Sequence, residues 1–316
     1  MKLRNRMITM FVLIGVLFLG LSSVYAETAE EYFKQGFVSY GQGNFTQAIS
    51  DYTKAIEINP NSAETYSNRG NAYGSKGDYD KAISDYNKAI ELNPNLAEAY
   101  CSRGLTYGNQ GNLPKAISDL TKAIELNPNL AEAYYDRGLA YKTQGNFTQA
   151  ISDFTKAIEI NPNFAEYYYN RGIVYNKTHN LPQAISDFNK VLEMNPDYAE
   201  AYYNRGLTYF LQSNFTQAIS DFNNAIRIDP KYEGAYCNRG VAYSIQGNFT
   251  QAIPDLTKAL EIDPNDIISY ANRGPAFYQV KEYDKAWADV HKAEELGYTF
   301  EPKFLDDLKK ASGRDK

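Results

Sequence analysis

The segment AETYSNRGNAYGSKGDYDKAISDYNKAIELNPNL spans residues 63–96, and variants of it follow one another along most of the chain. One proline of the segment recurs every 34 residues, at Pro60, Pro94, Pro128, Pro162, Pro196, Pro230 and Pro264. A 34-residue period is typical of stacked helix-turn-helix units. Each unit has an apolar face that only its neighbours can bury, so the pattern predicts a solenoid with a long open surface.

Two helices are expected in each unit. Tyr66, Gly70 and Tyr73 follow the i, i+4, i+7 spacing of one helical face, and Gly77 interrupts the pattern. A second apolar face then continues up to Pro94, where the residue before proline avoids the α region. For the start of the first helix we expect a capping box between Asn61 and Glu64, three residues apart.

Counting by the same period in both directions from residue 63 gives eight units and a short remainder at the C-terminal end. The expected units are 29–62, 63–96, 97–130, 131–164, 165–198, 199–232, 233–266 and 267–300. Residues 301–312 are expected to form a capping helix that covers the last unit, and residues 313–316 a short tail.

This pattern resembles the tetratricopeptide repeat over residues 29–300, because Tyr66, Gly70, Tyr73, Ala82 and Pro94 recur at the family's positions. The resemblance implies an all-α fold, a right-handed superhelix of antiparallel helix pairs whose first helices line the concave side. It also implies a protein–protein interaction scaffold that binds a protein or peptide in that groove.

The first 26 residues have a different composition. Lys2, Arg4 and Arg6 precede an apolar run over residues 7–21, and Ala26 ends a short small-residue site. This order is typical of a secretory signal peptide, and the run is short for a membrane span. We therefore expect cleavage after Ala26, no membrane span afterwards, and a periplasmic or secreted protein. Retention of residues 1–26 as a membrane anchor is the alternative.

Composition narrows the classes of function. The formal charge of −6 argues against nucleic acid, which requires a basic surface. The two histidines, His179 and His291, lie far apart in the sequence, and no metal-binding spacing, phosphate loop or nucleophile elbow is present. We expect a non-enzymatic protein with no cofactor and no metal.

Two charged rows run through the repeats. The seventh position of seven units is arginine: Arg69, Arg103, Arg137, Arg171, Arg205, Arg239 and Arg273. The twenty-third position is aspartate, at Asp51, Asp85, Asp119, Asp153, Asp187, Asp221, Asp255 and Asp289. Arginine grips a carboxylate through two hydrogen bonds. We favour structural pairs within each unit, which leaves Asp51 opposite Gln35, and Gln35 can form a hydrogen bond with it. Pairs between units, or an anion site built from the arginines, are alternatives.

The first helices carry a second set of residues away from their packing face. In the central units we expect Tyr135, Tyr169, Asn170, Tyr203, Asn204 and Asn238 to line the concave groove. Asparagine can donate to and accept from a peptide backbone, and tyrosine supplies rigid contact area. The row resembles the asparagine ladder of the O-linked sugar transferase superhelix, without that protein's transferase domain. The alternative is that these asparagines bond to the neighbouring repeat.

The expected function is therefore a monomeric, exported scaffold that binds an unidentified protein or peptide. The alternatives are a self-associating structural scaffold and the regulatory subunit of an enzyme complex in the cell envelope.

Overall fold

The computed structural model describes residues 27–314, and these residues form helices without strands. The chain divides into two compact units after Pro128. The helices of the first unit, here called the first array, are α2 (Ala29–Gly41), α3 (Phe45–Ile58), α4 (Ala63–Ser75), α5 (Tyr79–Leu92), α6 (Ala97–Asn109) and α7 (Leu113–Leu126).

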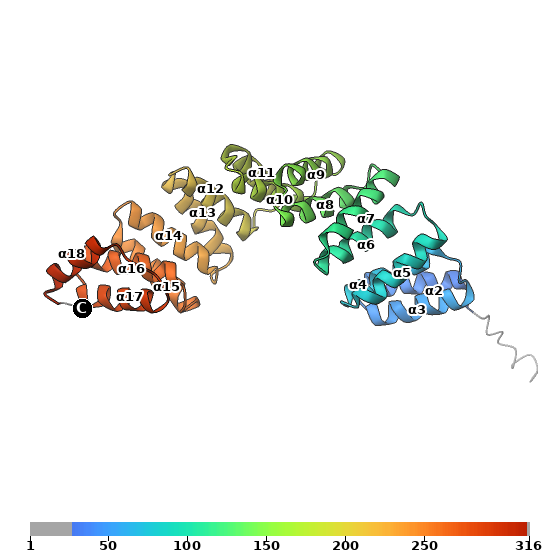
Figure 1. The fold of residues 1–316 in the computed structure, drawn as a ribbon, viewed down its shortest axis with the longest axis horizontal. Helices are drawn as coiled ribbons and strands as arrows, with labels where there is room; N and C mark the ends of the chain where they lie inside the picture. Colours follow the sequence, from blue (N-terminus) through green and yellow to red (C-terminus); the bar gives the residue numbers. More distant parts are fainter. Residues whose placement is uncertain (1–26, 315–316) are drawn as a thin grey trace, which may run out of the picture. The chain divides into compact units, whose positions relative to one another are not determined.

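The remaining helices form the second array. They are α8 (Ala131–Gln144), α9 (Phe147–Ile160), α10 (Ala165–Lys177), α11 (Leu181–Met194), α12 (Ala199–Leu211), α13 (Phe215–Ile228), α14 (Glu233–Ile245), α15 (Phe249–Ile262), α16 (Ile267–Gln279), α17 (Tyr283–Glu295) and α18 (Pro302–Ser312). Within each array, consecutive helices pack as antiparallel pairs, and each pair stacks on the next (Figure 1). The all-α solenoid expected from the sequence is confirmed.

Helices of a pair approach closely because the eighth position of the unit is glycine. A Cβ atom added to Gly206 in α12 would lie 2.7 Å from the Phe222 ring of α13, which is too close for a carbon contact. The corresponding atom on Gly70 would lie 2.6 Å from the Tyr86 ring. The last pair is looser, since the nearest atom to a Cβ on Gly274 is 3.4 Å away.

The turn inside each pair needs a left-handed backbone. Glycine takes that conformation in most units, as at Gly77 with a φ of 81°. His179, Ser213 and Lys281 occupy the same position with φ values of 56°, 58° and 64°. Side chains disfavour this region, so these three turns carry local strain.

The expected capping box between Asn61 and Glu64 is wrong by one residue. The N-cap of α4 is Ser62, whose hydroxyl accepts a hydrogen bond from the Thr65 amide. Asn59 Oδ1 instead accepts from the Asn61 amide at 3.2 Å and closes the turn before the helix. The glutamates at the second position of the first helices are therefore not needed as caps.

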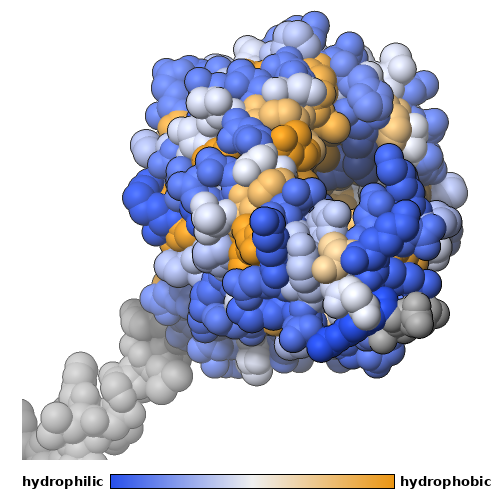
Figure 2. Space-filling view, turned by 90° about the vertical axis from the view of Figure 1, so that its left-hand side faces the viewer, coloured by the Kyte–Doolittle hydropathy of each residue, from blue (hydrophilic) through white to orange (hydrophobic). Residues whose placement is uncertain are grey.

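Helix α18 covers the end of the second array, as expected for residues 301–312. Its Leu308 is fully buried with Trp287 and Phe300, and Trp287 Nε1 donates to Ser312 Oγ at 3.0 Å. Figure 2 faces the end of the chain that carries α18 and shows a largely hydrophilic surface with only separate hydrophobic patches. The helix therefore replaces the neighbour that the last repeat lacks.

Among residues 27–314, no helix has the length and apolar composition needed to span a membrane. The expected signal peptide, residues 1–26, lies outside the described residues.

Candidate functional site: a tyrosine–asparagine ladder

The six expected groove residues lie on one face of consecutive first helices. Tyr135 belongs to α8, Tyr169 and Asn170 to α10, Tyr203 and Asn204 to α12, and Asn238 to α14. They occupy the fifth and sixth positions of their units, so the solenoid places a tyrosine of one repeat beside an asparagine of the next.

Each tyrosine hydroxyl accepts a hydrogen bond from the asparagine of the following repeat. Asn170 Nδ2 lies 3.0 Å from Tyr135 Oη, and Asn204 Nδ2 lies 3.1 Å from Tyr169 Oη. Asn238 Nδ2 donates in the same way to Tyr203 Oη at 3.1 Å. We call these three pairs the ladder.

The second amide hydrogen of each asparagine stays within its own helix. Asn170, Asn204 and Asn238 donate to the backbone oxygens four residues earlier, at 3.0, 2.8 and 2.9 Å. The structure therefore has the neighbour-bonding alternative, and these amides have no hydrogen left to donate to a ligand. This is a correction to the expectation that the asparagines both donate and accept.

The ladder still leaves hydrogen-bonding capacity at each rung. A tyrosine oxygen that accepts from asparagine keeps its own hydrogen as a donor. Among the described residues nothing donates to Oδ1 of Asn204 or Asn238, whereas Oδ1 of Asn170 accepts from Lys142 Nζ at 2.6 Å. Two rungs thus combine a free donor with a free acceptor, the pair that a peptide unit requires.

Aromatic packing fixes the tyrosine rings. The Tyr169 ring stacks on Tyr198 at 5.1 Å between centroids and lies 6.1 Å from Phe188. Tyr203 packs edge-on against Tyr232 at 4.8 Å. Because these contacts hold the rings in place, the hydroxyls are oriented before any ligand arrives.

A row of carboxylates borders the ladder. Glu132, Glu166 and Glu200 stand at the second position of α8, α10 and α12. Burial raises the pKa of Tyr135 to about 12, and the nearby Asp136 and Glu166 carboxylates add to the rise. Burial likewise raises the pKa of Tyr169 to about 12, with Glu200 contributing. The hydroxyls are therefore protonated donors beside negative charge.

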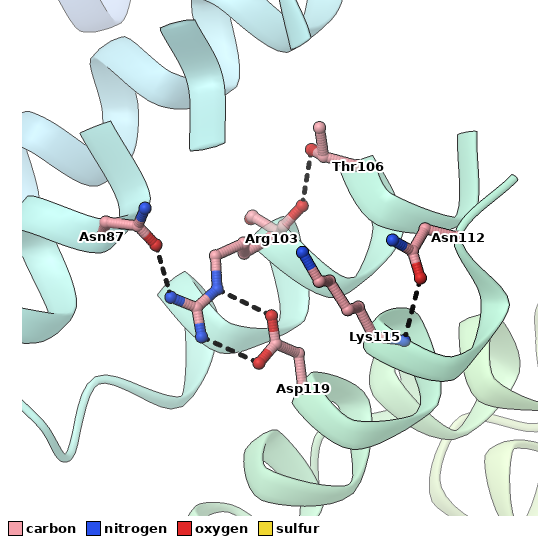
Figure 3. A network of polar contacts seen from close by, with 7 residues as sticks. Asn87, Arg103, Thr106, Asn112, Lys115 and Asp119 are labelled. Carbon is pink, nitrogen blue, oxygen red and sulfur yellow. Dashed lines mark hydrogen bonds and ion pairs between the residues drawn. The ribbon is translucent and has the colours of Figure 1, made fainter. Parts of the chain in front are cut away.

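Each arginine of the seventh position pairs with the aspartate of its own unit. In the pair drawn in Figure 3, Arg103 Nε lies 2.7 Å from Asp119 Oδ2 and Arg103 Nη2 lies 2.8 Å from Asp119 Oδ1. The other pairs repeat this two-bond geometry: Arg69–Asp85, Arg137–Asp153, Arg171–Asp187, Arg205–Asp221, Arg239–Asp255 and Arg273–Asp289.

A third contact of the arginine, which the sequence analysis missed, reaches the preceding repeat. Arg103 Nη1 donates to Asn87 Oδ1 at 2.6 Å, and Arg171 Nη1 donates to Thr155 Oγ1 at 3.0 Å. The guanidinium of Arg171 also lies 5.8 Å from the ring centre of Tyr168. These contacts give the arginines a structural role. Because the guanidinium nitrogens already donate to protein atoms, few of their hydrogens remain for an anionic ligand.

The unpaired aspartate of the first unit has different partners from those expected. Asp51 accepts from Gln47 Nε2 at 2.7 Å and from Ser39 Oγ at 3.3 Å, while Gln35 donates to Glu27 at 2.8 Å. The expected Gln35–Asp51 bond is wrong, because Gln47 lies one turn before Asp51 on the same helix.

A hollow in the first array was not foreseen from the sequence. A cavity of about 540 Å³ opens beside α4 and α6, and its lining includes Ser67, Asn68, Asn71 and Glu98. Position five, tyrosine in the ladder, is here serine. A signal was therefore present in the sequence, because a small residue stands where the ladder units have a ring.

The two histidines do not form a site. His179 occupies the strained turn before α11, and the His291 ring packs 5.4 Å from the Trp287 ring on α17.

Family models match the sequence of both arrays. The TPR repeat model matches residues 38–77, 70–111 and 109–145. The tetratricopeptide repeat model matches residues 131–164, 165–198, 199–232 and 234–266. No curated protein matches the sequence.

Solved structures share the fold. YrrB, described as a TPR protein with an unusual peptide-binding site, is 30% identical over 58% of this chain and 95% of that chain, with a TM-score of 0.52. The C-terminal part of a TPR repeat-containing protein from Cytophaga hutchinsonii is 21% identical over 76% of this chain and 98% of that chain, with a TM-score of 0.62. A tetratricopeptide repeat protein from Parabacteroides merdae is 24% identical over 80% of this chain and 99% of that chain, with a TM-score of 0.57.

Proposed function

The chain belongs to the tetratricopeptide repeat family, whose members are protein-interaction scaffolds, and we propose that it binds an extended peptide or protein segment along the ladder. The observation that carries the proposal is the row of free tyrosine donors on α8, α10 and α12, which is accompanied by free asparagine acceptors on α12 and α14. We further propose that the chain itself is non-catalytic and that the ladder lies on the concave side of the repeats.

Rigid rungs favour such a ligand. An extended peptide exposes its own donors and acceptors, and a surface whose groups are already oriented loses little entropy when it binds them. YrrB, which is similar to 58% of the present chain, is itself described as having a peptide-binding site. That description supports the same class of ligand here.

The charge of the ladder face indicates a basic segment. Glu132, Glu166 and Glu200 are not capping residues, and among the described residues no lysine or arginine forms an ion pair with them. Positively charged side chains of a ligand would find complementary charge in this row of carboxylates.

Apolar contact is available at the end of the first helices in the same array. Leu211 at the end of α12 and Ile245 at the end of α14 are each 54% exposed. We therefore propose a ligand that combines basic and apolar side chains in an extended conformation.

A randomised peptide library tests this proposal. We expect peptides selected on the chain expressed from residue 27 to be rich in lysine and arginine. They should bind about 10-fold more weakly, about 1.4 kcal/mol, when Glu132, Glu166 and Glu200 are all changed to glutamine.

The matched control changes Glu159, Glu193 and Glu261 to glutamine. These glutamates lie on second helices, and each pairs with a lysine of its own helix. Equal losses of affinity in both triple variants would show a general charge effect and contradict a ligand at the ladder.

We propose that the protein is exported, with cleavage after Ala26, and that it is a monomer. Mass spectrometry of the protein recovered from cells that express the full chain should find a mature chain beginning at Glu27. A chain that still begins at Met1 and is found in the membrane fraction would instead support retention of residues 1–26 as a membrane anchor. Light scattering that shows mass rising with concentration would favour the self-associating scaffold.

A further inference from the structure

Three acidic or thiol side chains meet beside the end of the ladder, where α14 faces α16. Glu233 and Cys237 are one turn apart on α14, and Asp266 is the N-cap of α16. One potential ligand atom from each residue lies within 4.8 Å of the other two.

All three residues depart from the repeat. The first position of the unit is alanine in the preceding unit, at Ala199, whereas in this unit it is Glu233. The fifth position is Tyr203 in the preceding unit and Cys237 in this unit. The last position is Tyr232, the aromatic partner of Tyr203, in the preceding unit and Asp266 in this unit. The packed ring pair of the two preceding units is thus replaced by a thiol and a carboxylate.

Ser269, three residues after Asp266, also departs from the repeat, because the third position of the two preceding units is alanine, at Ala201 and Ala235. Ser269 of α16 is 0% exposed, and its hydroxyl has no hydrogen-bond partner among the described residues. This hydroxyl lies beside the Cys237 thiol, and a buried hydroxyl without a hydrogen-bond partner is costly.

We propose that Glu233, Cys237 and Asp266 form a binding site for a divalent metal ion of the zinc class. Zinc takes thiolate sulfur at about 2.3 Å and carboxylate oxygen at about 2.0–2.2 Å in a tetrahedral arrangement. Ligand atoms already within 4.8 Å of one another reach that arrangement through small side-chain movements. Calcium and magnesium take oxygen ligands alone, so the thiol excludes them as the preferred ions.

The surroundings suit an ion at this position. Asp266 is oriented by two backbone amides, since Oδ1 accepts from Ile268 at 3.1 Å and Oδ2 from Ser269 at 3.0 Å. Such second contacts hold a ligating carboxylate in place. The ion would bridge consecutive first helices, with a water or the Ser269 hydroxyl as the fourth ligand. On binding, the Cys237 S–H bond is replaced by a sulfur–metal bond and the proton passes to water.

Cobalt(II) is the probe for the test because a cobalt–thiolate bond gives a charge-transfer absorption band. We expect the chain expressed from residue 27, without a histidine tag, to bind one Co²⁺ with this band, and added Zn²⁺ to remove it. Cys237→Ser should abolish the band, whereas Cys101→Ser at the same repeat position, far along the sequence, should keep it.

Two further variants keep the test independent of misfolding. Glu233→Ala restores the alanine of other repeats, and Asp266→Asn keeps a residue that caps helices well. Both should retain the helical circular dichroism and lower Co²⁺ affinity by about 10-fold or more. A wild-type chain without a thiolate band, or a band that survives Cys237→Ser, would overturn the proposal.

Discussion

The first helices of the two arrays have the same framework but different faces. In the first array the fifth position is small at Ser67, and a cavity of about 540 Å³ opens there. In the second array the same position carries Tyr135, Tyr169 and Tyr203, which pack on neighbouring rings and accept hydrogen bonds from the next repeat. The cavity thus lies beside a unit that lacks the ring, whereas three consecutive units of the second array carry an ordered row of hydroxyls at the same position.

The parts that hold the repeats together do not differ between the arrays. Arg103 in the first array and Arg171 in the second each grip an aspartate with two bonds and reach the preceding repeat with a third. Stability and binding thus depend on different positions, which allows the face to vary while the solenoid is kept.

The largest expected effect concerns what the arrays share. Arg103→Ala and Arg171→Ala should each lower the free energy of unfolding by about 3–5 kcal/mol, because each leaves a buried aspartate without its partner. Urea unfolding of both variants measures this. Similar losses are expected in the two arrays.

Arg227→Ala is the control for these variants, since Arg227 is an exposed arginine 3.8 Å from Asp197. It should change the free energy of unfolding by less than about 1 kcal/mol. If Arg171→Ala is as mild as Arg227→Ala, the structural role of the arginine row is wrong.

The next effect should separate the arrays. Tyr169→Ser gives the second array the residue that Ser67 supplies in the first, and it removes a packed ring and one rung of the ladder. We expect a loss of about 2–3 kcal/mol in the free energy of unfolding, less than for a fully buried ring because Tyr169 is partly exposed. Ser67→Ala should cost less than about 1 kcal/mol, because it removes a buried hydroxyl and no ring. Comparable values for both would remove the distinction between the two faces.

A smaller effect depends on pH and concerns Asp136, which stands where Asn170 and Asn204 occur in the following repeats. Burial, with a contribution from Glu132, raises the pKa of Asp136 to about 7. Its carboxyl thus stays protonated in the folded chain while it ionises in the unfolded chain, so the stability it contributes is present at about pH 4 and lost as the pH rises toward 7.

Asp136→Asn removes this titration. At about pH 8 the variant should be more stable than the wild type by about 1–2 kcal/mol, and the difference should shrink at about pH 4. Thermal unfolding at the two pH values is the measurement. A difference that does not change with pH would contradict a raised pKa.

The smallest expected effect extends the ladder into the first array. Phe33 occupies the fifth position of the first unit, and Asn68 of the next unit donates to the Glu64 backbone oxygen at 3.1 Å. Phe33→Tyr would offer Asn68 a second acceptor and should raise the free energy of unfolding by about 0.5–1 kcal/mol. The same change should have no effect when Asn68 is alanine, which a double-mutant cycle checks.

The sequence predicts the repeat well because its signals are local and occur many times. The glycine of the eighth position, the paired helices and the arginine–aspartate partners follow from spacing alone. The helix start was misplaced by one residue, since Asn61 and Ser62 are both good caps and sequence does not choose between them.

Contacts between repeats were harder to foresee. The bonds from Asn170 to Tyr135 and from Arg103 to Asn87 depend on how far one helix is shifted along the next. The meeting of Glu233, Cys237 and Asp266 joins residues of two helices, and only the stacked geometry brings them together. A count of residue types along one helix contains none of this information.

Hydrogen–deuterium exchange tests the central claim, that the ladder is the ligand surface, most directly. The probe is a peptide selected from a randomised library on the chain expressed from residue 27. Its binding should slow exchange in the first helices α10, α12 and α14 and leave the second helices α11 and α13 unchanged. Slowed exchange confined to α11 and α13, with α10 and α12 unaffected, would contradict the account.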